Sequence, residues 1–181
     1  KGRLVAAERD TKKCSFADFG NSPFDFTSDK VAEKEIIFTT TNGTQAVEAA
    51  INAREIIIGA FSNISRVVRF LNSNNLNVII LCSGWNNRFC LEDTIFAGTL
   101  SAILLESDSF TFKSDSVNAA TQLWQLAKSD LNNYICHTEH FDRLLRNGLE
   151  NSVDYCLSFD TTAVLPRYIK SEAVFKNSMN D

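Results

Sequence analysis

Three apolar runs in the first half of the chain each end in a polar loop, and residues with helical spacing follow each loop. The runs cover residues 35–40, 55–61 and 77–82 and are rich in β-branched side chains. Such runs, alternating with helices, are typical of strands in a parallel sheet that is covered on both faces. The pattern predicts helices after the three strands, over about 44–53, 64–71 and 91–105.

The second half of the chain is less regular. Helical spacing covers residues 118–128 and 135–147, and Asn147-Gly148 is a typical helix C-cap. Residues 153–159 alternate like a further strand. No repeat, low-complexity tract or linker rich in Pro and Ser divides the chain, so we expect a single domain over residues 1–181. The predicted fold class is α/β, three-layer α/β/α with a mixed, largely parallel central sheet.

The loop Thr40-Thr41-Asn42-Gly43-Thr44 carries the clearest candidate chemistry. Right-handed crossovers place it at the carboxyl edge of the sheet together with the loops after the other two strands, and open α/β sheets bind ligands at that edge. Backbone N–H groups and the positive end of a helix dipole suit a phosphate or a carboxylate. The same residues are equally typical of a turn and a helix cap without a ligand.

Two pairs of residues are candidates for metal binding. Glu92 and Asp93 open the predicted helix over 91–105 and are hard oxygen ligands that suit Mg²⁺. Acidic residues in a first turn also stabilise a helix without any metal. His137 and His140 are the only histidines of the sequence and lie three residues apart, but no third ligand is near them in the sequence. We therefore interpret the histidines as solvent-facing or capping residues.

Two further clusters offer polar side chains to a ligand. Arg9, within Glu8-Arg9-Asp10, is suited to bind a carboxylate, sulfonate or phosphate. The alternative is a solvated charge cluster. Asn21 and Ser22 belong to a turn that could aim amide and hydroxyl donors at a ligand, and a turn without a ligand is again the alternative.

Composition excludes some classes of partner. A net charge of −4 provides no broad basic surface, which argues against nucleic-acid binding. No apolar run is long enough for a membrane span, and the first residues lack the apolar core of a signal peptide. Neither a Walker loop nor a dinucleotide fingerprint is present, which disfavours a nucleotide-binding module. Five cysteines without a C-x-x-C pair indicate reduced, mostly buried thiols of a cytoplasmic protein.

Taken in order along nearly the whole chain, these segments resemble the 2-phosphosulfolactate phosphatase family of coenzyme M biosynthesis and its bacterial relatives. The matching segments are Glu8-Arg9-Asp10, Gly20-Asn21-Ser22-Pro23, Thr39-Thr40-Thr41-Asn42-Gly43-Thr44, Phe61-Ser62-Asn63, Cys82-Ser83-Gly84, Leu91-Glu92-Asp93, Ala97-Gly98, His140 through Leu144, Gly148, Asp154, Asp160 and Pro166. The resemblance implies an α/β fold with a mixed central sheet. It also implies Mg²⁺-dependent hydrolysis of the phosphate ester of a 2-hydroxy acid, with 2-phospho-3-sulfolactate as the named substrate.

This sequence departs from the family pattern in two ways. Ala7 stands where the family usually has Gly, and Ser83 stands where it often has Ala. Both changes are mild. The family's further N-terminal strand has no match here, which could remove part of the site. We therefore expect a family domain that lacks this N-terminal segment.

Within this matched set each cluster receives an expected role. The residues expected to hold the phosphoryl oxygens are Thr40, Thr41, Asn42, Gly43 and Thr44. The residues expected to meet the substrate's carboxylate or sulfonate are Arg9, Asn21 and Ser22. Glu92 and Asp93 are expected to bind Mg²⁺, and Glu8 or Asp160 to orient the attacking water or assist the metal.

The leading hypothesis is a cytoplasmic phosphoric monoester hydrolase that acts on a small anionic phosphate ester. The alternative is a non-catalytic anion-binding protein or a truncated, inactive family member. No nucleic-acid or membrane partner is expected, and the oligomeric state, a homo-oligomer included, is left open.

Overall fold

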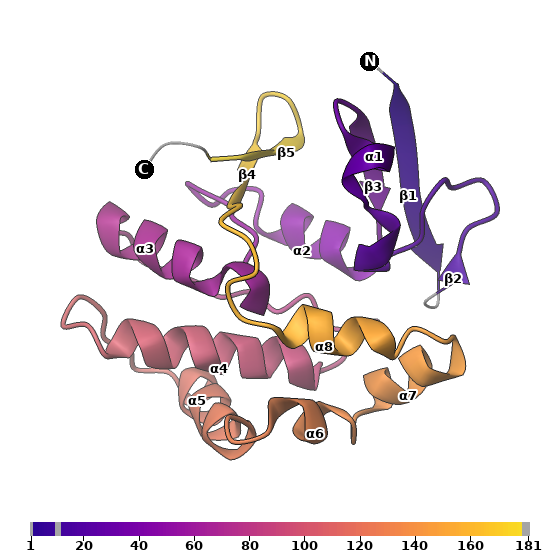
Figure 1. Ribbon diagram of the computed structural model, residues 1–181. Helices are drawn as coiled ribbons and strands as arrows, with labels where there is room; N and C mark the ends of the chain where they lie inside the picture. Colours follow the sequence, from indigo (N-terminus) through magenta and orange to yellow (C-terminus); the bar gives the residue numbers. More distant parts are fainter. Residues whose placement is uncertain (1, 10–11, 179–181) are drawn as a thin grey trace.

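Short strands lie in the N-terminal and C-terminal parts of the chain and a run of helices lies between them (Figure 1), in a computed structural model that describes residues 2–9 and 12–178. The strands are β1 (Arg3–Arg9), β2 (Lys12–Lys13), β3 (Glu35–Thr39), β4 (Pro166–Ile169) and β5 (Val174–Asn177). The helices are α1 (Ser28–Val31), α2 (Asn42–Ala49), α3 (Ile64–Asn74), α4 (Leu91–Leu105), α5 (Asp115–Ala127), α6 (Leu131–Ile135), α7 (Glu139–Arg146) and α8 (Asn151–Leu157), with short 3-10 helices at Pro23–Asp25 and Phe61–Asn63.

The main sheet is small and mixed. Its three described strands follow the order β2-β1-β3, in which β1 pairs with β3 in parallel and with β2 antiparallel. The strands β4 and β5 form a separate antiparallel pair. The expected mixture of helix and strand is confirmed, and so is a mixed sheet. A three-layer arrangement stays a prediction, because the sheet that would form its central layer has only these three described strands.

Two of the strand predictions made from the sequence are wrong. Residues 55–61 and 77–82 belong to no strand, although Ile57 forms an isolated antiparallel bridge to Arg167. The physical reason is that a β-branched run favours an extended backbone but does not supply the neighbouring strand to which it must bond.

The segment 77–82 shows this difference in its side chains. Val78 and Ile80 pack against the hydrophobic core. Ile79, between them, is 90% exposed. A strand inside a parallel sheet would bury both faces, whereas this segment buries one.

The strand predicted over 153–159 is also wrong, because these residues lie mainly in helix α8. Val153 and Leu157 are four residues apart and both pack in the core cluster that α8 shares with α6. An i, i+4 pair of this kind fits a helix as well as the alternation fits a strand. Helix α4, in contrast, spans the residues predicted for it, and Gly148 follows α7 with a positive φ of 67° as the C-cap requires.

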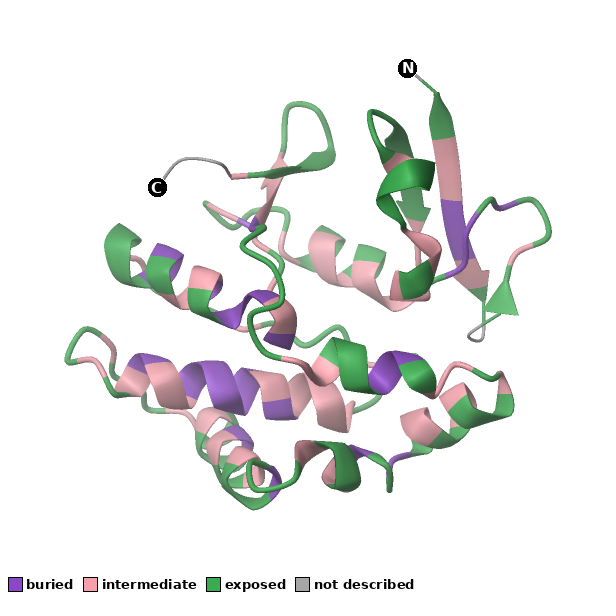
Figure 2. Cartoon of the chain, viewed as in Figure 1, coloured by how far each residue is buried: buried purple, intermediate pink, exposed green. Residues whose placement is uncertain are grey.

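The core consists of two clusters that meet at α4, which is the most buried helix in Figure 2. One cluster joins α3 and α4 with Leu165, which is fully buried. The other joins α4 with α5, α6 and α8, and Phe96 packs against both clusters. Gly98 lets α5 approach α4 closely, because a Cβ at that position would collide with the backbone carbonyl of Ala120.

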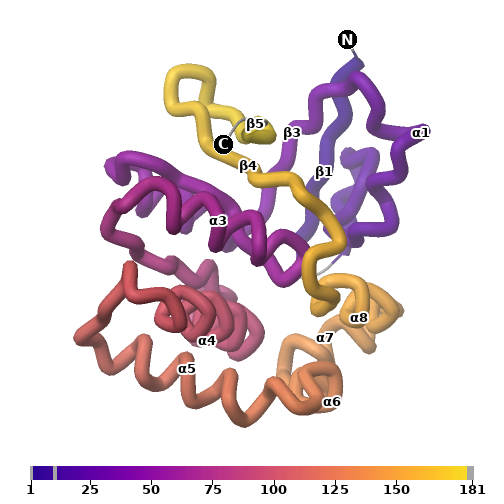
Figure 3. The backbone as a smooth tube through the Cα atoms, turned by 60° about the vertical axis from the view of Figure 1, so that its left-hand side comes forward, coloured from indigo at the N-terminus to yellow at the C-terminus, as the bar shows by residue number. Residues whose placement is uncertain are grey.

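Helix α8 lies between the helical part of the molecule and the end of the sheet (Figures 1 and 3). It contacts α6 on one side and the 3-10 helix Pro23–Asp25 on the other. This arrangement encloses the space beyond the carboxyl ends of β1 and β3. Within the described part of the chain, no helix combines the length and apolarity needed to cross a membrane.

The cysteines are free thiols, but the expectation that most are buried is wrong. Cys82, Cys136 and Cys156 are exposed, and Cys14 and Cys90 are half-buried. The apolar runs that contain several of them lie at the surface, as for 77–82, so burial does not follow from local hydrophobicity.

Candidate functional site

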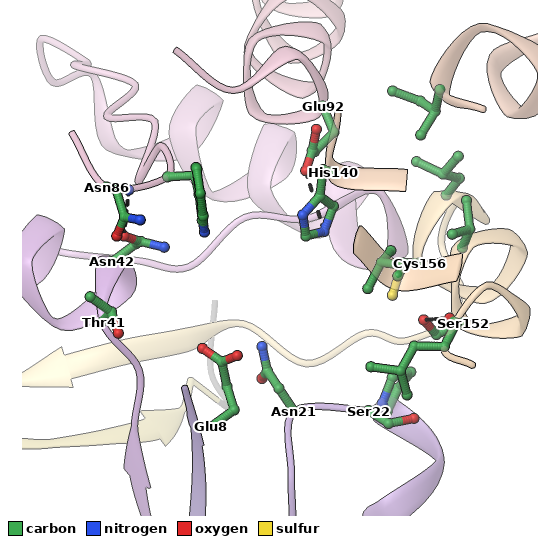
Figure 4. A pocket seen from close by; sticks show the side chains of 17 residues that line it. Glu8, Asn21, Ser22, Thr41, Asn42, Asn86, Glu92, His140, Ser152 and Cys156 are labelled. Carbon is green, nitrogen blue, oxygen red and sulfur yellow. Dashed lines mark hydrogen bonds and ion pairs between the residues drawn. The ribbon is translucent and has the colours of Figure 1, made fainter. Parts of the chain in front are cut away.

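A cavity of about 270 Å³ lies beyond the ends of β1 and β3, between the sheet and helices α7 and α8 (Figure 4). It brings together several residues that the sequence predicts for the site, which are Glu8, Asn21, Ser22, Thr41, Asn42 and Glu92. Its opposite wall comes from α6 to α8 and is largely apolar, with Ser152 and Cys156 among its polar members. Four segments distant in the sequence therefore converge on one space.

Glu8, Asn21 and Ser22 occupy one side of the cavity because of the local structure around β1. Glu8 stands near the carboxyl end of β1, where the parallel pairing with β3 stops. The turn that carries Asn21 and Ser22 is fixed by Asp25, whose carboxylate accepts a hydrogen bond of 3.0 Å from the Gly20 N–H. This bond aims the turn at the cavity.

The threonine-rich loop contributes only part of its polar groups. The Thr40 hydroxyl accepts a hydrogen bond from the Gly43 N–H at 3.1 Å, and the Thr44 hydroxyl donates to the Thr40 carbonyl at 2.7 Å. These bonds close the loop on itself and start helix α2, as the capping interpretation expected. Thr41 and Asn42, however, line the cavity. The capping interpretation is therefore confirmed for Thr40, while anion binding by Thr41 and Asn42 stays a prediction.

The loops after β3 and before α4 meet, although residues 77–82, which precede the second loop, are not the sheet strand that the prediction assumed. The Asn42 side-chain oxygen accepts a hydrogen bond from the Asn86 N–H at 3.0 Å. Trp85 and Asn86 also line the cavity. One amide thus joins two loops that are more than 40 residues apart in the sequence.

Glu92 and Asp93 point to different partners. Glu92 lines the cavity and its carboxylate lies 3.5 Å from His140 Nε2. Asp93 accepts hydrogen bonds from the Gly84 N–H at 2.8 Å and the Ser83 hydroxyl at 3.2 Å, which fixes the turn before α4. Across the described residues, no group of three or more His, Cys, Asp or Glu side chains is placed to hold a metal ion.

Arg9 and Asp160 do not line the cavity. Arg9 is exposed and donates a hydrogen bond of 2.6 Å to the Glu8 carbonyl. Asp160 accepts hydrogen bonds from the Ser65 N–H at 2.8 Å and the Ser65 hydroxyl at 2.6 Å, at the start of α3. Their expected roles in the reaction stay predictions, while Asp10 lies outside the described residues.

His140 is a further candidate for the site, to which the sequence analysis gives no role. It lines the cavity, and its Nδ1 lies 3.1 Å from Nη2 of Arg143. A guanidinium can only donate, so Nδ1 accepts this bond, which leaves the proton on Nε2, facing Glu92. The matched segment from His140 to Leu144 contains the signal for it, whereas the spacing of the two histidines alone favours a solvent-facing or capping role.

The thiol in the cavity wall is a weak nucleophile. Desolvation raises the pKa of Cys156, although the residue as a whole is exposed. Desolvation also raises the pKa of Cys82, with the charge of Asp93 adding to it. Since the thiolate is the reactive form, neither cysteine is set up for nucleophilic catalysis at neutral pH.

Comparison with known proteins points to one family. A family model described as 2-phosphosulpholactate phosphatase matches residues 1–171. A protein named "Probable 2-phosphosulfolactate phosphatase" from Thermotoga maritima is 32% identical over 176 residues, which cover 97% of this chain and 75% of that protein. A protein of the same name from Caldanaerobacter subterraneus is 34% identical, over 91% of this chain and 68% of that protein. Another, from a Synechococcus species, is 38% identical, over 93% of this chain and 70% of that protein.

Proposed function

Because the chain belongs to the 2-phosphosulpholactate phosphatase family, we propose that it hydrolyses the phosphate ester of a small 2-hydroxy acid, with 2-phospho-3-sulfolactate as the substrate. The products are 3-sulfolactate and inorganic phosphate. One observation carries the proposal: Glu8, the Asn21-Ser22 turn, the Thr41-Asn42 loop and Glu92 converge on a single cavity.

The charge of the cavity supports a divalent cation as cofactor. Glu8 and Glu92 are carboxylates, and none of the described residues in the lining is a Lys or Arg. A substrate with several acid groups would be repelled by these carboxylates unless a cation is bound with it. Mg²⁺ is commonly held by one or two carboxylates together with substrate phosphate oxygens and water, so a cluster of three protein ligands is not required.

We propose Glu92 as the protein ligand of Mg²⁺. Its carboxylate faces the cavity, whereas that of Asp93 is occupied by the turn at Ser83 and Gly84. When bound, Mg²⁺ would offset the negative charge on the phosphoryl oxygens in the transition state.

The remaining residues position the substrate and activate the attacking water. Thr41 and Asn42 are placed to donate hydrogen bonds to phosphoryl oxygens, and Asn21 and Ser22 to donate to a carboxylate or sulfonate of the substrate. The Glu8 carboxylate orients the attacking water and accepts its proton. The water oxygen forms a bond to phosphorus as the ester P–O bond breaks, and the alkoxide of the hydroxy acid leaves and takes a proton from solvent water.

A phosphate-release assay tests this proposal. The purified protein is incubated with 2-phospho-3-sulfolactate or 2-phospholactate, in Mg²⁺ or in EDTA. We expect release in Mg²⁺, its loss in EDTA and its return when Mg²⁺ is restored. Absence of release from both esters would overturn the proposal, and binding of 3-sulfolactate without turnover would favour the alternative of an anion-binding protein.

A further inference from the structure

A second cavity, of about 350 Å³, lies beside the first. The two share Trp85, Glu92 and His140, so these side chains form a common wall. The second lining includes Arg88 and Arg143, the cations that the first lacks. A molecule in the first cavity therefore has positive charge directly across this wall.

Arg143 is held in a defined position. Its guanidinium carbon lies 3.9 Å from the centre of the Trp85 ring, within the range of a cation–π contact. Its Nη2 donates to His140 Nδ1 at 3.1 Å. The side chain is only 16% exposed. Because packing fixes the guanidinium, a ligand that binds to it need not order a mobile side chain.

The charge of Arg143 is not fully compensated within the described structure. Within the described residues its ion-pair partner is Glu139, whose carboxylate lies 4.0 Å from Nη1 of Arg143. The Glu139 side chain is 87% exposed, and such surface ion pairs are weak. Its Nε is buried and has no hydrogen-bond partner among the described residues. A buried N–H of a charged group without an acceptor is costly, and an acid group bound beside Arg143 would help to compensate its charge.

We propose that the second cavity is a subsite for an acid group of the substrate, with Arg143 as the specificity-determining residue. The group is a carboxylate or a sulfonate, because both present oxygens that match the guanidinium fork. The phosphate ester would lie at Thr41 and Asn42, and the acid group would extend past the edge of Trp85 to Arg143. The proposal rests on the proposed function and assigns to Arg143 the role that the sequence suggested for Arg9.

The test compares three esters and three proteins. The esters are 2-phospho-3-sulfolactate, 2-phospholactate, which lacks the sulfonate, and 2-propyl phosphate, which lacks both acid groups. The proteins are the wild type, Arg143→Gln and the control Arg146→Gln, which makes the same charge change at an exposed position of the same helix. The readout is the ratio of kcat/KM for each acidic ester to kcat/KM for 2-propyl phosphate.

We expect Arg143→Gln to lower this ratio about 10- to 100-fold, as loss of a charged hydrogen bond would. A fall for both acidic esters assigns the subsite to the carboxylate, and a fall for the sulfonated ester alone assigns it to the sulfonate. Arg146→Gln should leave both ratios within about twofold. A ratio that Arg143→Gln leaves at the wild-type value would overturn the proposal.

Binding of 3-sulfolactate, measured by calorimetry, separates this inference from the proposed function. If the wild type hydrolyses none of the esters, the proposed function fails, but the subsite still predicts at least tenfold weaker binding to Arg143→Gln. Equal binding by the two proteins would contradict the subsite. If thermal denaturation shows that Arg143→Gln is unfolded, Arg88→Gln is measured in its place, because Arg88 is exposed and also lines the second cavity. We then expect 3-sulfolactate to bind Arg88→Gln at least threefold more weakly than the wild type. Binding equal to that of the wild type would contradict the subsite.

Discussion

At the scale of single residues, Glu92 and Asp93 show how adjacency in the sequence differs from adjacency in space. Successive residues of a helix point about 100° apart. Glu92 consequently lies beside His140 in the cavity wall, while Asp93 fixes the turn at Gly84. The sequence could identify the acidic pair as candidates, but it could not show that only one of the two carboxylates reaches the cavity.

The same limit applies to Asp160, for which the sequence predicts a catalytic role. Its position in a family-like segment is visible in the sequence, whereas its partner Ser65 is 95 residues away. Both oxygens of its carboxylate accept hydrogen bonds from Ser65, at the start of α3. The structure thereby assigns it a helix-capping contact, which local sequence does not reveal.

We expect Asp160→Asn to lower the free energy of unfolding by about 1 kcal/mol, because it weakens a capping contact. The kcat/KM for phosphate release should stay within about threefold of the wild type. Urea denaturation and the phosphate-release assay measure the two effects. An unchanged stability together with a loss of activity greater than about 100-fold would instead support the catalytic role that the sequence predicted.

At the scale of elements, the long helices could be predicted and the sheet could not. Helix α4 begins with two acidic residues and continues through an apolar stretch, so its limits are encoded locally. The runs 55–61 and 77–82 are extended, but whether they become strands depends on partners elsewhere in the chain. The sequence does not predict helix α8 for the same reason. Its residues fit the spacing of a helix and the alternation of a strand equally well, and contacts with α6 decide between them.

The contact between α4 and α5 gives an element-scale prediction. Gly98→Ala places a Cβ against the backbone carbonyl of Ala120, which cannot move without shifting α5. We expect the free energy of unfolding to fall by about 3 kcal/mol. The control Gly148→Ala has open space around the new Cβ and should cost only about 1 kcal/mol, from its positive φ. Equal losses for the two variants in urea denaturation would contradict close helix packing at Gly98.

At the scale of the whole molecule, the cavity lies where the sheet, the loop before α4 and helices α7 and α8 meet (Figure 4). Its polar residues come from the sheet edge and its apolar wall from the helical part. This division explains why the sequence identified the polar side of the site and missed the wall: polar loops after strands are locally visible, whereas the wall depends on how α8 packs.

Desolvation of Cys156 makes the stability of the whole chain sensitive to alkaline pH. Its pKa is raised above the ordinary 9.0 in the folded protein, so the folded state retains the thiol proton at a pH where the unfolded chain loses it. The resulting stability is present below about pH 9 and is lost as pH rises above that value. Urea denaturation between about pH 8 and 10.5 should show a steeper decline for the wild type than for Cys156→Ala. Parallel pH profiles would show that this thiol does not contribute.

The central claim is that the cavity containing Glu92 hydrolyses a phosphate ester. Its most direct test is the initial rate of phosphate release from 2-phospho-3-sulfolactate, measured for the wild type, Glu92→Gln and Glu106→Gln. Glu106→Gln is the control, because it makes the same change at an exposed residue at the far end of α4. Loss of a carboxylate that holds the cation should lower the rate about 100-fold or more, while the control stays within about twofold of the wild type. A Glu92→Gln rate equal to that of the wild type would contradict the account.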